Sequence, residues 1–125
     1  MKRDMDLVRH ILIETEQANE PIGLSDLVKP QWDDNTVAYH IQLMEHHGLL
    51  DCKVRRDFGG DVLDATIDGL TWDGCDYLDA IRDADIWSKT KKVVREAVGS
   101  TTMEVIKQAA IMVATSAIKS HLGIV

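Results

Sequence analysis

The sequence predicts a mainly α-helical fold with a small β-hairpin wing and additional C-terminal helices. Apolar residues recur at helical spacing through most of the chain, alternate at a spacing of two only between residues 50 and 69, and are separated by turn residues. The chain has 125 residues, of which 45% are hydrophobic and 28% charged. This composition is typical of a globular chain that can bury a core without disulfides or metals.

Two helical segments are expected in the first 29 residues. The first covers residues 4–19 and is ended by Pro21. Its apolar residues repeat at helical spacing: Met5, Val8, Ile11 and Leu12. The second is short, covering residues 25–29, with Ser25 as its N-cap and Pro30 as its stop.

A third helix is expected to begin at Asp33 or Asp34, because either aspartate is a good N-cap. Its buried stripe is formed by apolar residues at helical spacing: Val37, Ala38, Ile41 and Met44. Gly48 follows at the position where a left-handed residue commonly ends a helix.

Alternating residues then predict two strands joined by a turn. Leu50, Cys52 and Val54 alternate with charged residues in the first strand, and a Gly-containing loop covers residues 57–61. Val62 and Leu63 are expected in or near this loop. The returning strand places three residues on one face: Ala65, Ile67 and Gly69. Thr71 is the expected cap of a fourth helix, which continues to Ile81.

The order helix, helix, helix, strand, loop, strand, helix is that of a winged helix-turn-helix domain, expected to span residues 1–82. Residues 47–50, His-Gly-Leu-Leu, are similar to the end of the third helix in many winged-helix proteins. Residues 70–78, which begin Leu-Thr-Trp-Asp-Gly, are similar to the segment after their wing. In this motif Thr71 would cap a helix and Gly74 would let it pack closely on a neighbour.

A narrower resemblance covers most of the chain. Met-Lys-Arg-Asp-Met-Asp-Leu at residues 1–7, Ala-Tyr-His at 38–40, Gly-Leu at 48–49 and Leu-Thr-Trp at 70–72 resemble a family of uncharacterised winged-helix proteins from bacteria, prophages and phages. The resemblance implies the fold and a mobile-element context. It implies no site residues.

Two further helices are expected after the winged-helix domain. The first, residues 83–98, is amphipathic. Its apolar face carries Ile86, Thr90, Val93 and Ala97, and its polar face carries Ser88, Lys91, Lys92 and Arg95. Gly99 ends it, and residues 101–104 have the pattern of a capping box. The second, residues 100–122, is apolar around most of its circumference.

This last helix predicts an oligomerisation seam. Its apolar residues are spaced 3, 4, 3, 4, as in a helix–helix interface: Met103, Ile106, Ala110, Val113 and Ala117. Because neighbouring apolar residues widen the stripe, we expect it to be buried between the chains of a homodimer or higher homo-oligomer. Packing on its own domain is the alternative.

Charge and cysteine content limit the classes of function. The net charge of −7 is uneven: residues 1–85 hold 8 Lys/Arg and 19 Asp/Glu (−11), whereas residues 86–125 hold 6 and 2 (+4). A protein that coats nucleic acid by bulk charge is therefore not expected. The charge-free stretch 108–118 is too short to span a membrane. Two cysteines without metal or redox spacing, and no signal core, predict a cytoplasmic protein with reduced thiols.

No motif with a catalytic mechanism is present, so we expect no enzymatic activity, cofactor, metal or small-molecule substrate. His40, His46 and His47 do not have the i, i+3 or i, i+4 spacing of helical metal ligands. They are interpreted as surface and boundary residues.

The candidate binding residues belong to the third helix and the wing. Opposite the buried stripe of the helix lie Asn35, Tyr39, Gln42 and His46, and the wing adds Lys53, Arg55 and Arg56. Lys91, Lys92 and Arg95 form a secondary basic face. We expect a regulatory DNA-associated protein that acts as a homo-oligomer. The alternative is an acidic protein–protein interaction module, such as a phage inhibitor whose carboxylates mimic nucleic acid toward a basic host protein.

Overall fold

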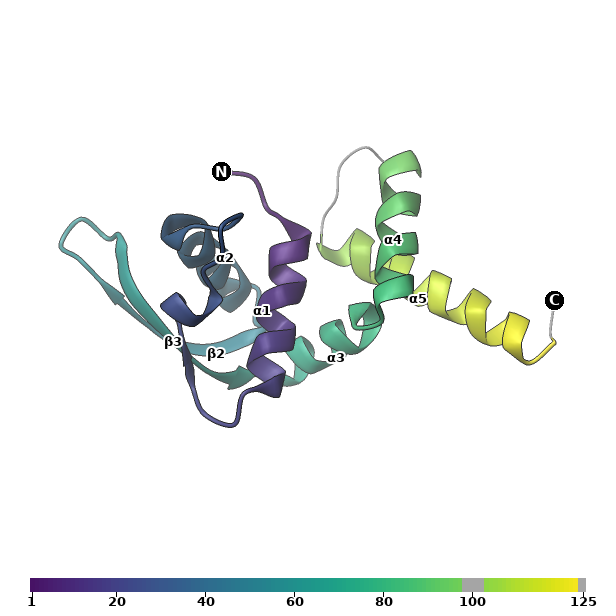
Figure 1. Cartoon of the computed structure of the whole chain (residues 1–125), viewed down its shortest axis with the longest axis horizontal. Helices are drawn as coiled ribbons and strands as arrows, with labels where there is room; N and C mark the ends of the chain where they lie inside the picture. The colour runs from purple at the N-terminus through teal and green to yellow at the C-terminus, as the bar shows by residue number, and fades with distance from the viewer. Residues whose placement is uncertain (98–102, 124–125) are drawn as a thin grey trace. The chain divides into compact units, whose positions relative to one another are not determined.

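The computed structural model describes residues 1–97 and 103–123. These residues form five α-helices, one 3-10 helix and a three-stranded antiparallel sheet (Figure 1). The prediction of a mainly helical fold with a small hairpin and C-terminal helices is confirmed. The chain divides into two compact units, Met1–Asp76 and Tyr77–Val125. Each unit is described by itself.

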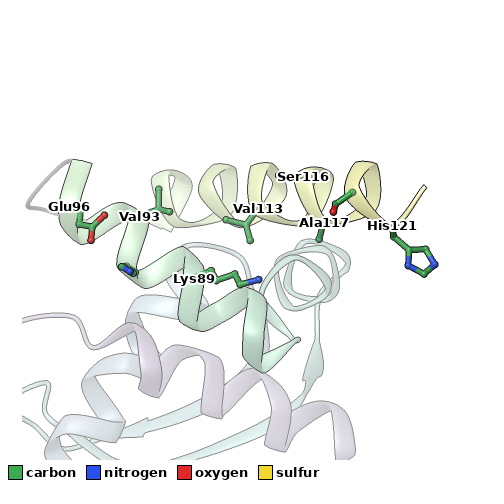
Figure 2. A pocket seen from close by; sticks show the side chains of 9 residues that line it. Lys89, Val93, Glu96, Val113, Ser116, Ala117 and His121 are labelled. Carbon is green, nitrogen blue, oxygen red and sulfur yellow. The ribbon is translucent and has the colours of Figure 1, made fainter. Parts of the chain in front are cut away.

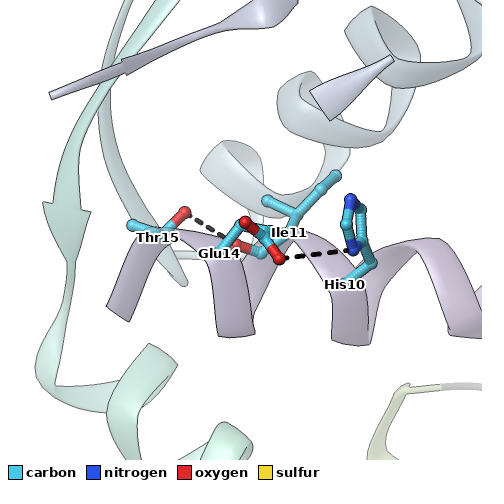
Figure 3. A network of polar contacts seen from close by, with 4 residues as sticks. All are labelled: His10, Ile11, Glu14 and Thr15. Carbon is cyan, nitrogen blue, oxygen red and sulfur yellow. Dashed lines mark hydrogen bonds and ion pairs between the residues drawn. The ribbon is translucent and has the colours of Figure 1, made fainter. Parts of the chain in front are cut away.

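The first helix, α1 (Met5–Gln17), begins where the sequence predicts. The carboxylate of Asp4 caps it by accepting hydrogen bonds from the backbone N–H groups of Asp6 (2.9 Å) and Leu7 (3.3 Å). The predicted stripe is buried, together with two residues that widen it: Met5, Leu7, Val8, Ile11, Leu12 and Thr15. Figure 3 shows two local contacts along α1: Thr15 donates to the Ile11 carbonyl, and His10 lies beside Glu14.

The short segment after α1 differs from its prediction. Instead of a helix capped by Ser25, the structure has a two-residue strand, β1 (Ile22–Gly23), followed by a 3-10 helix, η1 (Leu24–Leu27). The backbone N–H of Gly23 donates to the Asp26 carboxylate (2.9 Å), which fixes the first turn of η1. The predicted helix was wrong because Leu24 and Leu27, three residues apart, are both buried by a single 3-10 turn.

The helix α2 (Asp34–His46) is capped by Asp33, whose carboxylate accepts from the Thr36 N–H (2.8 Å). The predicted buried stripe is confirmed. His40 is also fully buried, which corrects its interpretation as a surface or boundary residue. Its Nε2 accepts from the Asp4 N–H (2.7 Å), and its Nδ1 lies 2.8 Å from the Thr36 carbonyl. These contacts tie α2 to the start of α1.

The sheet has the strand order β1-β3-β2. The hairpin strands β2 (Leu50–Arg56) and β3 (Val62–Leu70) pair antiparallel. Val62 and Leu63 belong to β3, not to the loop. Leu50, Ala65 and Ile67 are buried as predicted. β1 pairs with β3 through Ile22 opposite Ile67, so a third strand completes the sheet.

The two motifs that carry the family resemblance meet in space. The Thr71 hydroxyl donates to the Gly48 carbonyl (2.5 Å) and accepts from the Gly74 N–H (3.0 Å), which caps the helix α3 (Trp72–Ile81). The Thr71 N–H donates to the Leu49 carbonyl (3.1 Å). A Cβ at position 74 would overlap the carbonyl oxygen of Leu49. The predicted close packing at Gly74 is therefore confirmed.

The second unit contains the end of α3 and the helices α4 (Ala84–Ala97) and α5 (Met103–His121). Asp83 caps α4 through the Ile86 N–H (2.9 Å). The predicted apolar face of α4 was partly wrong, because Trp87, Thr90 and Val94 are its buried residues and Val93 is exposed. The side chain of Ala97 and the predicted end and cap at Gly99, Thr101 and Thr102 lie outside the described part of the chain.

The first half of α5 is buried inside its own chain. Met103, Ile106 and Ala110 are buried, α5 packs on α4, and the Tyr77 hydroxyl donates to the Met103 carbonyl (2.7 Å). The expectation that the whole seam lies between chains is therefore corrected for these three residues. Val113 is half-buried and Ala117 is exposed. Among the described helices, none is long and apolar enough to cross a bilayer.

Candidate functional site: the outward face of α2 and the hairpin

The outward face of α2 presents the four side chains predicted for it. Asn35 and His46 are exposed, and Tyr39 and Gln42 are half-buried. The Tyr39 ring meets the edge of the buried His40 ring, with the ring centres 5.6 Å apart. Because the opposite side of α2 is held by the core, these polar side chains have a fixed outward direction.

An arginine joins this face to the hairpin. When the Gln42 amide is oriented with its oxygen toward Arg56, the orientation that its hydrogen-bond partners favour, this oxygen accepts from Nη1 (3.2 Å) and Nη2 (3.1 Å) of Arg56. Nη1 of Arg56 also donates to the Gly60 carbonyl (3.1 Å). One guanidinium therefore connects the middle of α2 to the hairpin turn. The sequence suggested both residues as binding candidates but gave no sign that they touch.

The hairpin turn is braced by a single aspartate. The Asp57 carboxylate accepts from the N–H groups of Gly59 and Asp61, both at 2.9 Å. The Asp57 N–H donates to the Asp61 carbonyl (2.9 Å), and Gly60 takes a left-handed conformation with φ of +89°. This turn presents the Phe58 side chain fully exposed at the tip. Phe58 is therefore an accessible apolar side chain at the tip of the hairpin.

The basic residues of the hairpin do not form one cluster. Lys53 and Arg55 alternate with the half-buried Cys52 and Val54, so they project from the face opposite the core. There they line a shallow groove of about 260 Å³, and Asp64 lies across from Arg55 in the strand register. The structure therefore places Arg56 with α2 and the other two cations on the opposite face.

Carboxylates dominate the start of α2. Asp33 and Asp34 are exposed there, and hydrogen bonding from Thr36, chiefly its backbone N–H, lowers the pKa of Asp33. The helix itself contains neither Lys nor Arg. Positive charge at this face must therefore come from other elements, and Arg56 of the hairpin is in direct contact with α2.

Cys52 has no reactive character. Its thiol donates to the Glu45 carboxylate (3.3 Å). Burial, followed by the hydrogen bond and negative charge of Glu45, raises the pKa of Cys52 to about 12. A thiol that stays protonated is a poor nucleophile and metal ligand. Among the residues that the structure describes, no three His, Cys, Asp or Glu side chains gather in a way that could hold a metal ion.

The secondary basic face belongs to α4 in the second unit. Lys92 and Arg95 are exposed at its surface, and with Ser88 and Glu96 they line a depression of about 400 Å³. Lys91 is half-buried, and its Nζ lies 5.6 Å from the centre of the Trp87 ring. Such a cation–π contact fixes the Lys91 ammonium beside its own helix.

Comparison with known proteins places the chain in a family. Residues 2–101 match the model of DUF2513, which is described as a hypothetical protein. The chain belongs to the DUF2513 family. An uncharacterized protein of Haemophilus influenzae (strain Rd) is 33% identical over 112 residues, which cover 88% of this chain and 92% of that protein. No solved structure matches. The predicted resemblance to an uncharacterised family with bacterial members is confirmed at this level.

The matched region includes every candidate residue of α2 and the hairpin, because these lie between residues 35 and 56. It also includes α4 but ends before α5 begins. Sequence reasoning found the outward face of α2 from its helical spacing. It missed the Gln42–Arg56 contact, for which no short-range pattern exists.

Proposed function

We propose that the protein is a non-catalytic winged-helix regulator that binds DNA through the outward face of α2 and the β2–β3 hairpin. The observation that carries the proposal is the contact between Gln42 and Arg56. It joins a polar helix face to a hairpin that supplies cations and an exposed aromatic ring. DNA recognition of this type places a helix in the major groove and uses neighbouring elements for flanking contacts.

The side chains of α2 suit direct contact with bases. Asn35, Tyr39, Gln42 and His46 follow one another at intervals of 4, 3 and 4 residues, so they share one face of the helix. Amide side chains can pair with adenine edges in the major groove, and tyrosine and histidine can bond bases or phosphates.

The hairpin supplies what α2 lacks. Arg56 is held next to the helix face, where a phosphate could exchange for its contact with Gln42. Phe58 projects at the tip, where an apolar ring can pack into an adjacent minor groove. Because the first 85 residues carry a charge of −11, binding would depend on these few cations and not on bulk charge.

Fluorescence anisotropy with labelled duplex DNA at low salt tests the proposal. Replacing Arg56 with Ala should weaken binding to every sequence and flatten its salt dependence. Gln42→Ala should instead relax base preference. Arg82→Ala is the matched control, because Arg82 pairs with Asp79 on α3 and should leave binding unchanged. Wild-type protein that binds no duplex at low salt would contradict the proposal.

A second function is favoured by the exposed carboxylates of Asp33 and Asp34 at the start of α2. In this alternative the same surface binds a basic nucleic-acid-binding protein, and the carboxylates take the place of phosphates. Replacing both aspartates with Asn keeps the cap and removes the charge. The double variant should bind DNA more tightly if the protein reads DNA. If the protein is a mimic, the variant should lose a basic partner and gain no DNA affinity.

A further inference from the structure

The pre-helix segment, Met1–Arg3, is fastened to α2 and to the turn before it. The backbone N–H of Asp4 donates to Nε2 of the fully buried His40 (2.7 Å). The Asp4 carboxylate accepts from the indole N–H of Trp32 (2.9 Å), two residues before α2 begins. Because Asp4 also caps α1, the pre-helix segment leaves the first unit from a fixed point beside α2.

This anchor and the hairpin lie on opposite flanks of the outward face of α2. At 100° per residue, that face covers about 60° of the helix, from Gln42 at one edge to Tyr39 at the other. About 60° beyond Gln42 lies Glu45, which accepts from the Cys52 thiol of β2 (3.3 Å). About 100° beyond Tyr39 lies His40, which holds Asp4. The outward face is therefore bordered by the hairpin on one flank and by the pre-helix segment on the other.

The pre-helix segment brings positive charge to its flank. Lys2 and Arg3 are adjacent and exposed, whereas α2 itself contains neither Lys nor Arg. Each residue of an extended chain adds at most about 3.6 Å, so both side chains start within about 7 Å of Asp4. Asp33 and Asp34 follow directly on the turn that holds Asp4, and both are exposed. The two cations thus lie at the end of α2 where carboxylates would repel DNA.

We propose that Lys2 and Arg3 bind phosphates of the DNA backbone on the flank of α2 opposite Arg56. This assignment rests on the proposed function and adds a second group of phosphate contacts to it. A helix in the major groove lies between two phosphate backbones, so cations on its two flanks can each reach one strand. Two such groups would hold a duplex by local charge although residues 1–85 carry a net charge of −11.

Fluorescence anisotropy with a labelled duplex, at about 50 to 200 mM salt, tests the assignment. Each phosphate contact contributes about 0.9 to the slope of log K against log salt on B-DNA, so the Lys2→Ala/Arg3→Ala variant should lose about 2. The affinity advantage of the wild type should then shrink about tenfold across this salt range. The variant should melt close to the wild-type temperature, because both side chains are exposed outside any helix or strand.

A matched control removes two positive charges from the second unit. Lys89 lines the groove of about 800 Å³ between α4 and α5 (Figure 2), and Lys119 is exposed near the end of α5. The Lys89→Ala/Lys119→Ala variant changes the net charge by the same amount and should keep the wild-type slope. An equal loss in both double variants would show that overall charge sets the slope, and would overturn the assignment.

Replacing Asp33 and Asp34 with Asn separates direct contact from neutralisation. In that background, direct phosphate contacts predict that Lys2→Ala/Arg3→Ala still causes the full loss of slope. A loss that disappears there would mean that the cations only offset the two carboxylates, and would overturn the assignment. So would a wild type that binds DNA and is weakened by Arg56→Ala but not by Lys2→Ala/Arg3→Ala. A wild type that binds no duplex would overturn the proposed function and this assignment with it.

Discussion

Gly48 ends α2 in a left-handed conformation, with φ of +82°. No atom lies within 4 Å of where its Cβ would be, so a side chain there would have space but a strained backbone. Gly48→Val should therefore destabilise the fold by about 1–2 kcal/mol, because a β-branched residue is disfavoured in this conformation. Gly48→Asn should cost less, since asparagine tolerates it. Thermal melts of the two variants make the comparison, and a Gly48→Val variant that melts at the wild-type temperature would contradict it.

Cys52 and Cys75 should differ strongly in reactivity. Cys52 is half-buried, bonded to Glu45 and has a pKa raised to about 12, whereas Cys75 is exposed. At pH 8 only about one in ten thousand Cys52 side chains would be thiolate, and thiolate is the reactive form. Iodoacetamide should therefore modify Cys75 rapidly and Cys52 only as the pH approaches 12 or the chain unfolds.

Single-thiol chains allow this comparison, since Cys52→Ser and Cys75→Ser each leave one site to follow by mass spectrometry. Comparable rates at the two cysteines in the folded protein at pH 8 would show that Cys52 lacks the described environment.

At the scale of elements, the junction between α3 and the end of α2 depends on Gly74. Its backbone lies against the Leu49 carbonyl, and a Cβ there would force α3 to shift. Gly74→Ala should destabilise the first unit by about 1–3 kcal/mol, as overpacking of a close contact does. Gly69→Ala is the control, because no atom lies within 4 Å of the position that a Cβ would take there. Urea denaturation should separate the two variants, and equal midpoints would argue against the close packing.

Most elements could be predicted because their signals are local. The helices α1 and α2 combine a capping aspartate with an apolar stripe, and β2 has clear alternation of Leu50, Cys52 and Val54. β1 could not be predicted, since two residues are too few to show a period. On α4, the predicted apolar face contained Val93, whereas the structure buries Trp87 and exposes Val93. Tertiary packing decides which of these two side chains is buried.

The α5 seam shows a different limit of sequence reasoning. Its apolar spacing correctly predicted a helix that buries one stripe. The pattern could not distinguish packing of that stripe on α4 of the same chain from packing on a second chain, because both require the same apolar residues. The structure assigns Met103, Ile106 and Ala110 to the chain's own core and leaves Ile111, Ile118 and Leu122 exposed.

At the scale of the whole molecule, charge is unevenly divided along the chain. Residues 1–85 carry the net charge of −11 together with the outward face of α2 and the hairpin, and residues 86–125 carry +4. The candidate residues of α2 were predictable from helical spacing. Their combination with Arg56 was not, because that contact joins positions 14 residues apart through the tertiary fold. A proposed DNA site in an acidic unit must therefore depend on local geometry more than on overall attraction.

The most direct measurement of the central claim is an NMR titration of ¹⁵N-labelled protein with a DNA duplex at low salt. If the proposed surface binds DNA, amide shifts should change along the outward face of α2, at Asn35, Tyr39 and Gln42, and in the hairpin around Arg56 and Phe58. Addition of salt should reverse these changes as phosphate contacts are lost. Shifts confined to the basic face of α4, or no shifts at saturating DNA, would contradict the account.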